Sequence, residues 1–170
     1  MDGTEYLYFC QSFANVRVRA KYESFTDPTA YEALLWDVKA KEYRWQRDAA
    51  PTSQQEESRL IEDGVLPAEK ARYLLREVNT GKAVTLHRSS MAFNEYRQRW
   101  VLIGCQEGDR DAPSYLGEIW YAEADSPEGP WNTAVKIASH PNYSFYNPRQ
   151  HPFLAEAGSG TAAVTGRAFR

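Results

Sequence analysis

Four short strand-like segments follow one another between residues 86 and 138, and they constrain the fold more than any other part of the chain. The segments are residues 87–93, 99–105, 117–124 and 134–138. Residues 94–97 have the length of a tight hairpin, and the Pro and Gly within residues 125–131 favour a turn. Four antiparallel strands in about 50 residues are the size of one propeller blade. The sequence therefore predicts a complete blade over about residues 86–138.

The N-terminal part of the chain contains further strand candidates, at residues 5–11, 16–22 and 42–46. In residues 16–22 apolar and basic side chains alternate, which is typical of a strand with one buried and one exposed face. We interpret the basic stripe of Arg17, Arg19 and Lys21 as a solvated face, with an anionic ligand as the alternative. Asp27 and Pro28 are expected to begin a short helix that reaches Leu35.

Residues 52–79 have a different pattern, and we expect them to form a helical insertion. Thr52 and Gln55, or alternatively Ser53 and Glu56, have the spacing of a capping box, and Gly64 is placed to end the first helix. Pro67 is expected to begin a second helix, because apolar residues then recur at helical spacing up to Val78.

The chain has 170 residues, which is room for two to three blades, whereas closed propellers typically have about four to eight. The predicted fold class is therefore all-β with a helical insertion, as a partial β-propeller of two to three four-stranded antiparallel blades. Residues 147–154 resemble the first strand of another blade. Residues 156–170 lose the aromatic density of the preceding segment, and we expect an aberrant or disordered tail there.

The charge composition excludes some classes of function. With 20 basic and 23 acidic residues, the chain lacks the positive charge that a general nucleic-acid binder needs. We expect no membrane span, because no apolar run is long enough. We also expect no signal peptide in this chain, since Asp2 and Glu5 interrupt the start.

The sequence gives little sign of a metal or a cofactor, and we expect neither. Cys10 and Cys105 lie in apolar segments without Cys-x-x-Cys or Cys/His spacing, so we expect two buried free thiols, with a disulfide as the alternative. His87 and His140 have no partner at the spacing of metal ligands.

Residues 117–131, Gly-Glu-Ile-Trp-Tyr-Ala-Glu-Ala-Asp-Ser-Pro-Glu-Gly-Pro-Trp, carry a family resemblance. They resemble the five-bladed propeller glycosidases, the superfamily of arabinanases, xylosidases and fructosidases. In that group a strand commonly ends in a Ser-Pro-x-Gly-Pro-aromatic turn. The wider context, residues 94–100 and 143–153, is similar to uncharacterised bacterial proteins of the same propeller type. The resemblance covers about residues 86–155, and it implies a carbohydrate ligand and an extracellular or periplasmic location.

By resemblance, the chemistry is glycosidic-bond cleavage by two carboxylates that face a central funnel lined by the first strand of each blade. Here the first strand of the predicted blade, residues 87–91, has no carboxylate. The next blade has Asn147-Pro148 where family enzymes often carry Asp-Pro, and an amide cannot ionise. Glu118 is a weak catalytic candidate, and Glu123, five residues further on, should point to the opposite face of the sheet.

The candidate sugar-binding residues are Tyr146, Asn147, Gln150 and His151, which place polar groups within an aromatic segment. For His151, hydrogen bonding to backbone carbonyls is an equally good interpretation. Two functions remain open: a fragment of a glycoside hydrolase, and a non-catalytic carbohydrate-binding or interaction propeller that lacks the acids. A scaffold without sugar chemistry is a third possibility, because one fold hosts many functions.

Overall fold

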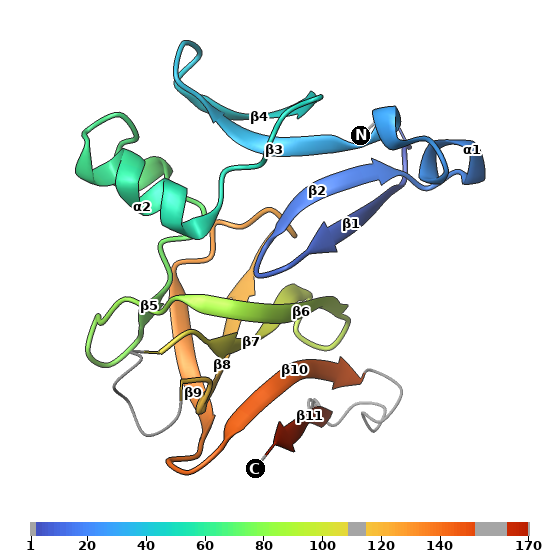
Figure 1. Cartoon of the computed structure of the whole chain (residues 1–170). Coiled ribbons are helices and arrows are strands. Elements are labelled where there is room, and N and C mark those ends of the chain that lie inside the picture. The colour runs from blue at the N-terminus through green and yellow to red at the C-terminus, as the bar shows by residue number, and fades with distance from the viewer. Residues whose placement is uncertain (1–2, 109–114, 152–162, 170) are drawn as a thin grey trace. The chain divides into compact units, whose positions relative to one another are not determined.

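The computed structural model describes residues 3–108, 115–151 and 163–169. The chain divides into two compact units, Met1–Ala71 and Arg72–Arg170, and each contains a β-sheet (Figure 1). Within the described residues, no helix has the length and apolar character needed to cross a membrane.

The first unit is built on a four-stranded sheet in which each strand pairs antiparallel with the next along the chain (Figure 1). Its strands are β1 (Tyr6–Cys10), β2 (Ala14–Arg19), β3 (Glu32–Asp37) and β4 (Glu42–Arg47). The short helix α1 (Tyr22–Phe25) and the 3-10 helix η1 (Pro28–Ala30) connect β2 to β3. The three strands predicted between residues 5 and 46 are confirmed as β1, β2 and β4.

The helix predicted from Asp27 to Leu35 is wrong. Asp27 does cap a helix, by accepting a hydrogen bond from the Thr29 amide, but η1 ends after three residues. The chain then enters β3, which pairs along its whole length with β4. Leu34 and Trp36 are buried in this strand, so burial and pairing with β4 outweigh the local helix signal.

The helix α2 (Gln54–Glu62) begins at the second of the two predicted capping boxes and ends where the sequence predicts. The Ser53 hydroxyl accepts a hydrogen bond from the Glu56 amide at 3.1 Å, and Gly64 takes the left-handed conformation, with φ of 69°. The helix is tied to the sheet just before its start, where the Trp36 amide donates to the Thr52 hydroxyl at 2.9 Å.

The second helix predicted from Pro67 to Val78 is also wrong. Only the 3-10 helix η2 (Ala68–Lys70) forms there. Ala71, Tyr73 and Leu75 are then buried at every second position, and residues 72–73 form a bend before the two-residue strand β5 (Arg76–Glu77). The apolar residues of this segment fit both helical and alternating spacing, and the burial of Tyr73 and Leu75 fits the alternating one.

The second unit is built on a five-stranded sheet in the order β5-β9-β8-β7-β6 (Figure 1). Strands β6 (Leu86–Asn94), β7 (Arg99–Gln106), β8 (Glu118–Ala124) and β9 (Thr133–Ser139) pair antiparallel, and β5 pairs parallel to β9. The four strands predicted between residues 86 and 138 are thus confirmed, as are the hairpin after β6 and the turn before β9. The additional parallel strand makes the sheet mixed.

The two faces of this sheet are covered differently. On one face Val101, Ile103, Cys105 and Ile119 form a buried apolar cluster, against which Phe145 of β10 (Ser144–His151) packs. Strand β10 pairs antiparallel with β11 (Ala163–Phe169) and lies against β6, β7 and β8 (Figure 1). Because side chains alternate along a strand, Trp120 of β8 lies on the opposite face.

Two predicted segments are described only in part. The strand expected over residues 147–154 overlaps β10, and residues 152–154 lie outside the described residues. Of the tail expected over residues 156–170, the structure describes residues 163–169, which form β11, and the rest lies outside the described residues.

The two cysteines occupy different environments. Cys105 is buried, as predicted, and burial raises the pKa of its thiol to about 11. The prediction of a second buried thiol is wrong, because Cys10 is exposed. Cys10 ends β1, which is an edge strand of its sheet and so has a neighbouring strand on one side only.

The basic stripe on β2 is not uniformly solvated. Arg17 forms an ion pair with Glu32 at 2.7 Å, and its guanidinium lies 4.1 Å from the ring centroid of Tyr6 and 4.2 Å from that of Trp45. Arg19 is exposed, as the interpretation of a solvated face expects. Arg17 therefore stabilises this sheet through both charge and aromatic contacts.

Candidate functional site

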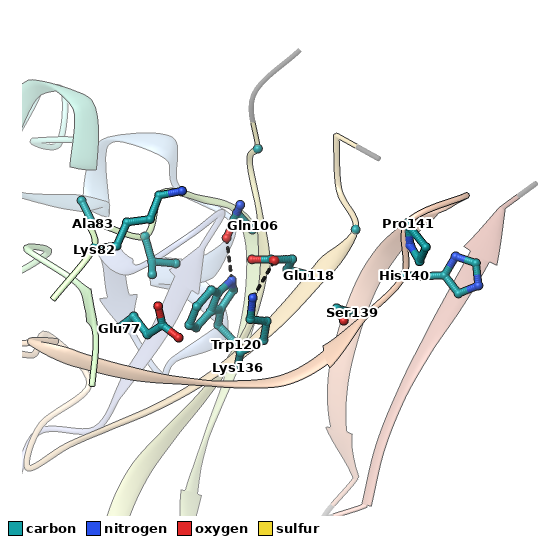
Figure 2. A pocket seen from close by; sticks show the side chains of 13 residues that line it. Glu77, Lys82, Ala83, Gln106, Glu118, Trp120, Lys136, Ser139, His140 and Pro141 are labelled. Atoms are coloured by element: carbon teal, nitrogen blue, oxygen red, sulfur yellow. Dashed lines mark hydrogen bonds and ion pairs between the residues drawn. The ribbon is translucent and has the colours of Figure 1, made fainter. Parts of the chain in front are cut away.

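The second unit contains an open pocket of about 530 Å³, shown in Figure 2. This volume lies within the range of about 300–1,000 Å³ that is usual for small-molecule sites. Strands β5, β7, β8 and β9, with the segments that follow them, supply its walls. The side chains that matter for its chemistry are Glu77, Lys82, Gln106, Glu118, Trp120 and Lys136.

Trp120 of β8 supplies an indole ring to the pocket lining. It is buried, and its indole N–H donates a hydrogen bond to Oε1 of Gln106 at 2.8 Å (Figure 2). Gln106 lies at the end of β7, so this bond fixes both side chains across two neighbouring strands. Because the Gln106 acceptor is occupied, its amide N–H groups are the atoms that can donate to a ligand.

Glu118 and Lys136 form an ion pair beside the tryptophan. The Lys136 ammonium lies 2.8 Å from a Glu118 carboxylate oxygen, and its nitrogen is 5.4 Å from the Trp120 ring centroid (Figure 2). The Glu118 and Lys136 side chains remain 29% and 39% exposed, so both present polar atoms to the pocket. The weak catalytic candidate from the sequence is therefore a pocket residue whose carboxylate already accepts a bond from a lysine.

Two further charged side chains come from the chain around β5. The Glu77 carboxylate points toward Trp120 in Figure 2 and accepts a hydrogen bond from the Thr80 hydroxyl. Lys82 also lines the pocket, and its ammonium forms no ion pair within the described part of the chain. With Glu118 and Lys136, the pocket thus carries two carboxylates and two ammonium groups.

His140 lies at the far edge of the pocket and contributes less to it. Its imidazole points away from Trp120 in Figure 2 and stacks on the Tyr143 ring. Its Nδ1 accepts a hydrogen bond from the Asn142 amide at 3.1 Å. The imidazole is therefore committed to the turn that leads into β10.

The sugar-binding residues predicted from the sequence lie elsewhere, on β10. We define the β6–β10 seam as strands Leu86–Asn94 and Ser144–His151, which lie against each other. The Tyr146 ring lies 6.4 Å from that of His87 and 5.9 Å from the Arg88 guanidinium. The backbone amide of Gln150 donates a hydrogen bond to the Ser90 hydroxyl at 3.3 Å. The structure therefore brings both Tyr146 and Gln150 to β6.

The other two predicted residues have different surroundings. Asn147 is exposed and takes the left-handed conformation, with φ of 48°, at an irregularity in the pairing of β10 with β11. Asn tolerates this conformation better than most residues, which accounts for an amide at this position. His151 is half-buried at the last position of β10, opposite Ala163.

Glu123 belongs to a structural network on the face opposite to Glu118. It accepts hydrogen bonds from the Arg97 guanidinium and the Tyr121 hydroxyl. Burial raises the pKa of the Glu123 carboxyl, but these two bonds outweigh it and hold the pKa below its usual value. Burial and the bond to Glu123 raise the pKa of Tyr121. The predicted opposite orientation of Glu118 and Glu123 agrees with these partners.

Sequence reasoning missed most of the pocket. Period-two alternation places Glu118 and Trp120 on one face of β8, and this signal was available from the sequence alone. The pairing of Trp120 with Lys136 depends on a register shift between β8 and β9. Glu77 reaches the pocket only because its segment is extended and adds β5 beside β9.

The comparisons with known proteins add no relative: no protein-family model matches the chain, and no curated protein is significantly similar to it. Among the described residues, no three His, Cys, Asp or Glu side chains gather as ligands for a metal ion.

Proposed function

We propose that this protein binds a neutral carbohydrate, without cleaving it, in the pocket around Trp120. The observation that carries the proposal is the charge balance of the lining, in which the two carboxylates of Glu77 and Glu118 are matched by the two ammonium groups of Lys82 and Lys136. A sugar is uncharged and carries several hydroxyls, each of which can both donate and accept a hydrogen bond.

The same charges disfavour charged ligands. An anion entering the pocket would be repelled by Glu77 and Glu118, and a cation would be repelled by Lys82 and Lys136. The volume of about 530 Å³ supports a ligand of one or two sugar rings. Trp120 is too buried to be a stacking platform, so the proposal assigns recognition to the polar side chains around it.

The resemblance of residues 117–131 to the five-bladed propeller glycosidases supports a sugar as the ligand class. We propose that the four-stranded sheet β1 to β4 and the four strands β6 to β9 are blades of a partial propeller. In each set consecutive strands lie side by side as a meander, which a propeller blade requires, and β5 is an additional parallel strand beside β9.

Binding is favoured over hydrolysis because of Glu118. A general acid must hold a proton that it can deliver to the leaving oxygen, and the Glu118 carboxylate accepts a bond from Lys136 instead. Hydrolysis is the second candidate, because Glu77 and Glu118 line the same pocket and glycosidases use two carboxylates. Turnover of chromogenic arabinosides, xylosides or fructosides that is lost in Glu118→Gln would favour this second function.

The proposal is tested by calorimetric titration of the protein with neutral arabino-, xylo- and fructo-oligosaccharides. At least one series should bind, and Lys82→Ala and Glu77→Gln should each weaken it about three- to tenfold, since each removes or weakens one hydrogen bond. Lys82 is exposed and Glu77 is half-buried, so the variants should still fold.

Matched controls are Lys39→Ala and Glu69→Gln, which remove the same charges from exposed positions in the first unit. They should bind like the wild type. If no neutral oligosaccharide binds, or if both pocket variants bind as tightly as the controls, the pocket is not a sugar site.

A further inference from the structure

We infer a second binding site on the β6–β10 seam, for the anionic group of an acidic sugar. The two strands of the seam contain Arg88, Arg149, His87 and His151 and no Asp or Glu. The whole chain has a net charge of −3, so this concentration of basic side chains is local. Of these side chains, Arg88 and His87 both lie beside the Tyr146 ring, and positive charge at this place favours an anionic ligand.

Arg88 is the central residue of the site. Its side chain is exposed, and within the described part of the chain it forms no ion pair. Its guanidinium lies 5.9 Å from the Tyr146 ring centroid, which is a weak contact that leaves the N–H groups available. A guanidinium presents two parallel donors, and these match the oxygens of a carboxylate or a sulfate.

Neighbouring polar atoms extend the site beyond a single charge. Ser90 lies on the same face of β6 as Arg88. Its hydroxyl accepts a hydrogen bond from the backbone N–H of Gln150 and can still donate its own proton to a ligand. Oε1 of Gln150 is buried without a hydrogen-bond partner among the described residues. A buried acceptor left unpaired is costly, and a ligand hydroxyl would supply the missing donor.

These groups together select a ligand with an anionic group and a nearby hydroxyl, which is the pattern of a hexuronic acid or a sulfated sugar. Tyr146 adds an aromatic surface beside Arg88 for the sugar ring. The inference rests on the proposed function in one respect, because it takes the bearer of the anion to be a sugar.

The seam and the pocket are separate sites. Arg88 pairs with Cys105 of β7, which pairs with Ile119 of β8, so the three residues share one face of the sheet. Trp120 follows Ile119 and lies on the other face. A change at Arg88 should therefore leave the pocket around Trp120 intact.

The test is calorimetric titration at low salt with four probes: a hexuronic acid disaccharide, a sulfated disaccharide, a neutral disaccharide and inorganic sulfate. One of the acidic sugars should bind at least tenfold more tightly than the other three probes. Arg88→Ala should weaken it about ten- to a hundredfold, because a bond between charged groups is lost. Gln150→Leu should weaken it less, and Arg88→Lys should restore part of the affinity.

Arg19→Ala, which removes an exposed arginine from the first unit, is the matched control and should bind as the wild type does. Lys82→Ala should impair only neutral sugars. Equal affinity for inorganic sulfate and the acidic sugars, or an Arg88→Ala variant that binds acidic sugars normally, would overturn the inference. If neutral sugars fail to bind while the acidic preference and its dependence on Arg88 persist, the pocket proposal alone is wrong.

Discussion

The hydroxyl of Tyr43 in β4 donates a hydrogen bond to the carboxylate of Glu57 in α2, and that glutamate is only 1% exposed. Burial of a carboxylate is costly unless its oxygens are satisfied. This bond, together with the one between Trp36 and Thr52, therefore explains how a helix with a mostly polar sequence is held on the sheet of the first unit.

The first prediction follows from this contact. Tyr43→Phe removes the donor and leaves Glu57 buried with one partner fewer, so the free energy of unfolding should fall by about 1–3 kcal/mol. Chemical denaturation followed by tryptophan fluorescence measures the change. Tyr22→Phe, at a position that is 79% exposed, is the control and should have no effect. Equal stabilities of Tyr43→Phe and the wild type would show that the hydroxyl contributes nothing.

The second prediction concerns the dependence of stability on pH. The pKa of Glu123 is lower in the folded protein than its ordinary value of about 4.3, so the folded state binds this proton less readily than the unfolded chain does. The stabilisation by Glu123 is therefore fully present above about pH 4.3 and is lost as the pH falls through the lower folded value. Glu123→Gln should cost about 1 kcal/mol at pH 7, after allowance for the half-exposed Arg97, and much less near pH 3.

Urea unfolding of the wild type and Glu123→Gln at several pH values measures this difference. Arg97→Gln should flatten the same part of the pH profile, because it removes one of the two bonds that lower the pKa. A Glu123→Gln curve that runs parallel to the wild-type curve at all pH values would contradict the assignment.

The third prediction concerns the turn between β8 and β9. Gly129 has φ of 91°, and a Cβ placed on it would lie 2.9 Å from the Trp131 amide nitrogen and 3.0 Å from the Arg72 carbonyl oxygen. Both obstacles are backbone atoms that cannot move aside. Gly129→Ala should lower the free energy of unfolding by roughly 2 kcal/mol or more. Gly81→Ala, where φ is also positive and nothing lies near, separates the conformational cost from the steric one and should be milder.

Much of the sheet architecture could be predicted from the sequence, because alternation and turn residues are local signals. The strands β6 to β9 and their turns follow from such signals, and so does the capping of α2 by Ser53. The errors fall on segments whose conformation depends on distant partners. Leu34 needs β4 to become part of a strand, and Tyr73 needs the packing of the second unit.

The residues of the candidate sites also differ in whether local sequence signals are enough to predict them. Residue type alone predicts Tyr146 and Gln150 as candidate sugar-binding residues, and the structure places both against β6. Glu118 is the one pocket residue among the predicted site residues, because the other charged and amide side chains of the lining come from three separate segments of the chain. Residue type indicates what a side chain can bind, whereas register and pairing decide which side chains meet.

The fourth prediction concerns thiol reactivity. The pKa of Cys105 is raised by burial to about 11, so its thiolate is scarce at pH 8, whereas Cys10 is exposed. A disulfide reagent should therefore modify the Cys10 thiol rapidly and the Cys105 thiol only after unfolding. Cys10→Ser should remove the rapid phase and Cys105→Ser should leave it. Loss of the rapid phase in Cys105→Ser would contradict the burial of that residue.

The last prediction separates the two proposed sites by their response to salt. The pocket around Trp120 holds as many carboxylates as ammonium groups, and its proposed ligand is uncharged, so no net charge is brought together when it binds. Neutral sugar affinity should therefore change less than twofold between about 20 and 500 mM NaCl.

At the β6–β10 seam, an acidic sugar meets Arg88 and its basic neighbours, and the screening length falls from about 20 Å to about 4 Å over the same range. The affinity for the acidic sugar should fall by about tenfold, and Arg88→Ala should remove most of this salt dependence. Titrations of both ligands at the two salt concentrations measure the contrast. A neutral sugar with strongly salt-dependent binding would place charge recognition in the pocket, and a salt-independent acidic sugar would exclude Arg88 as its partner.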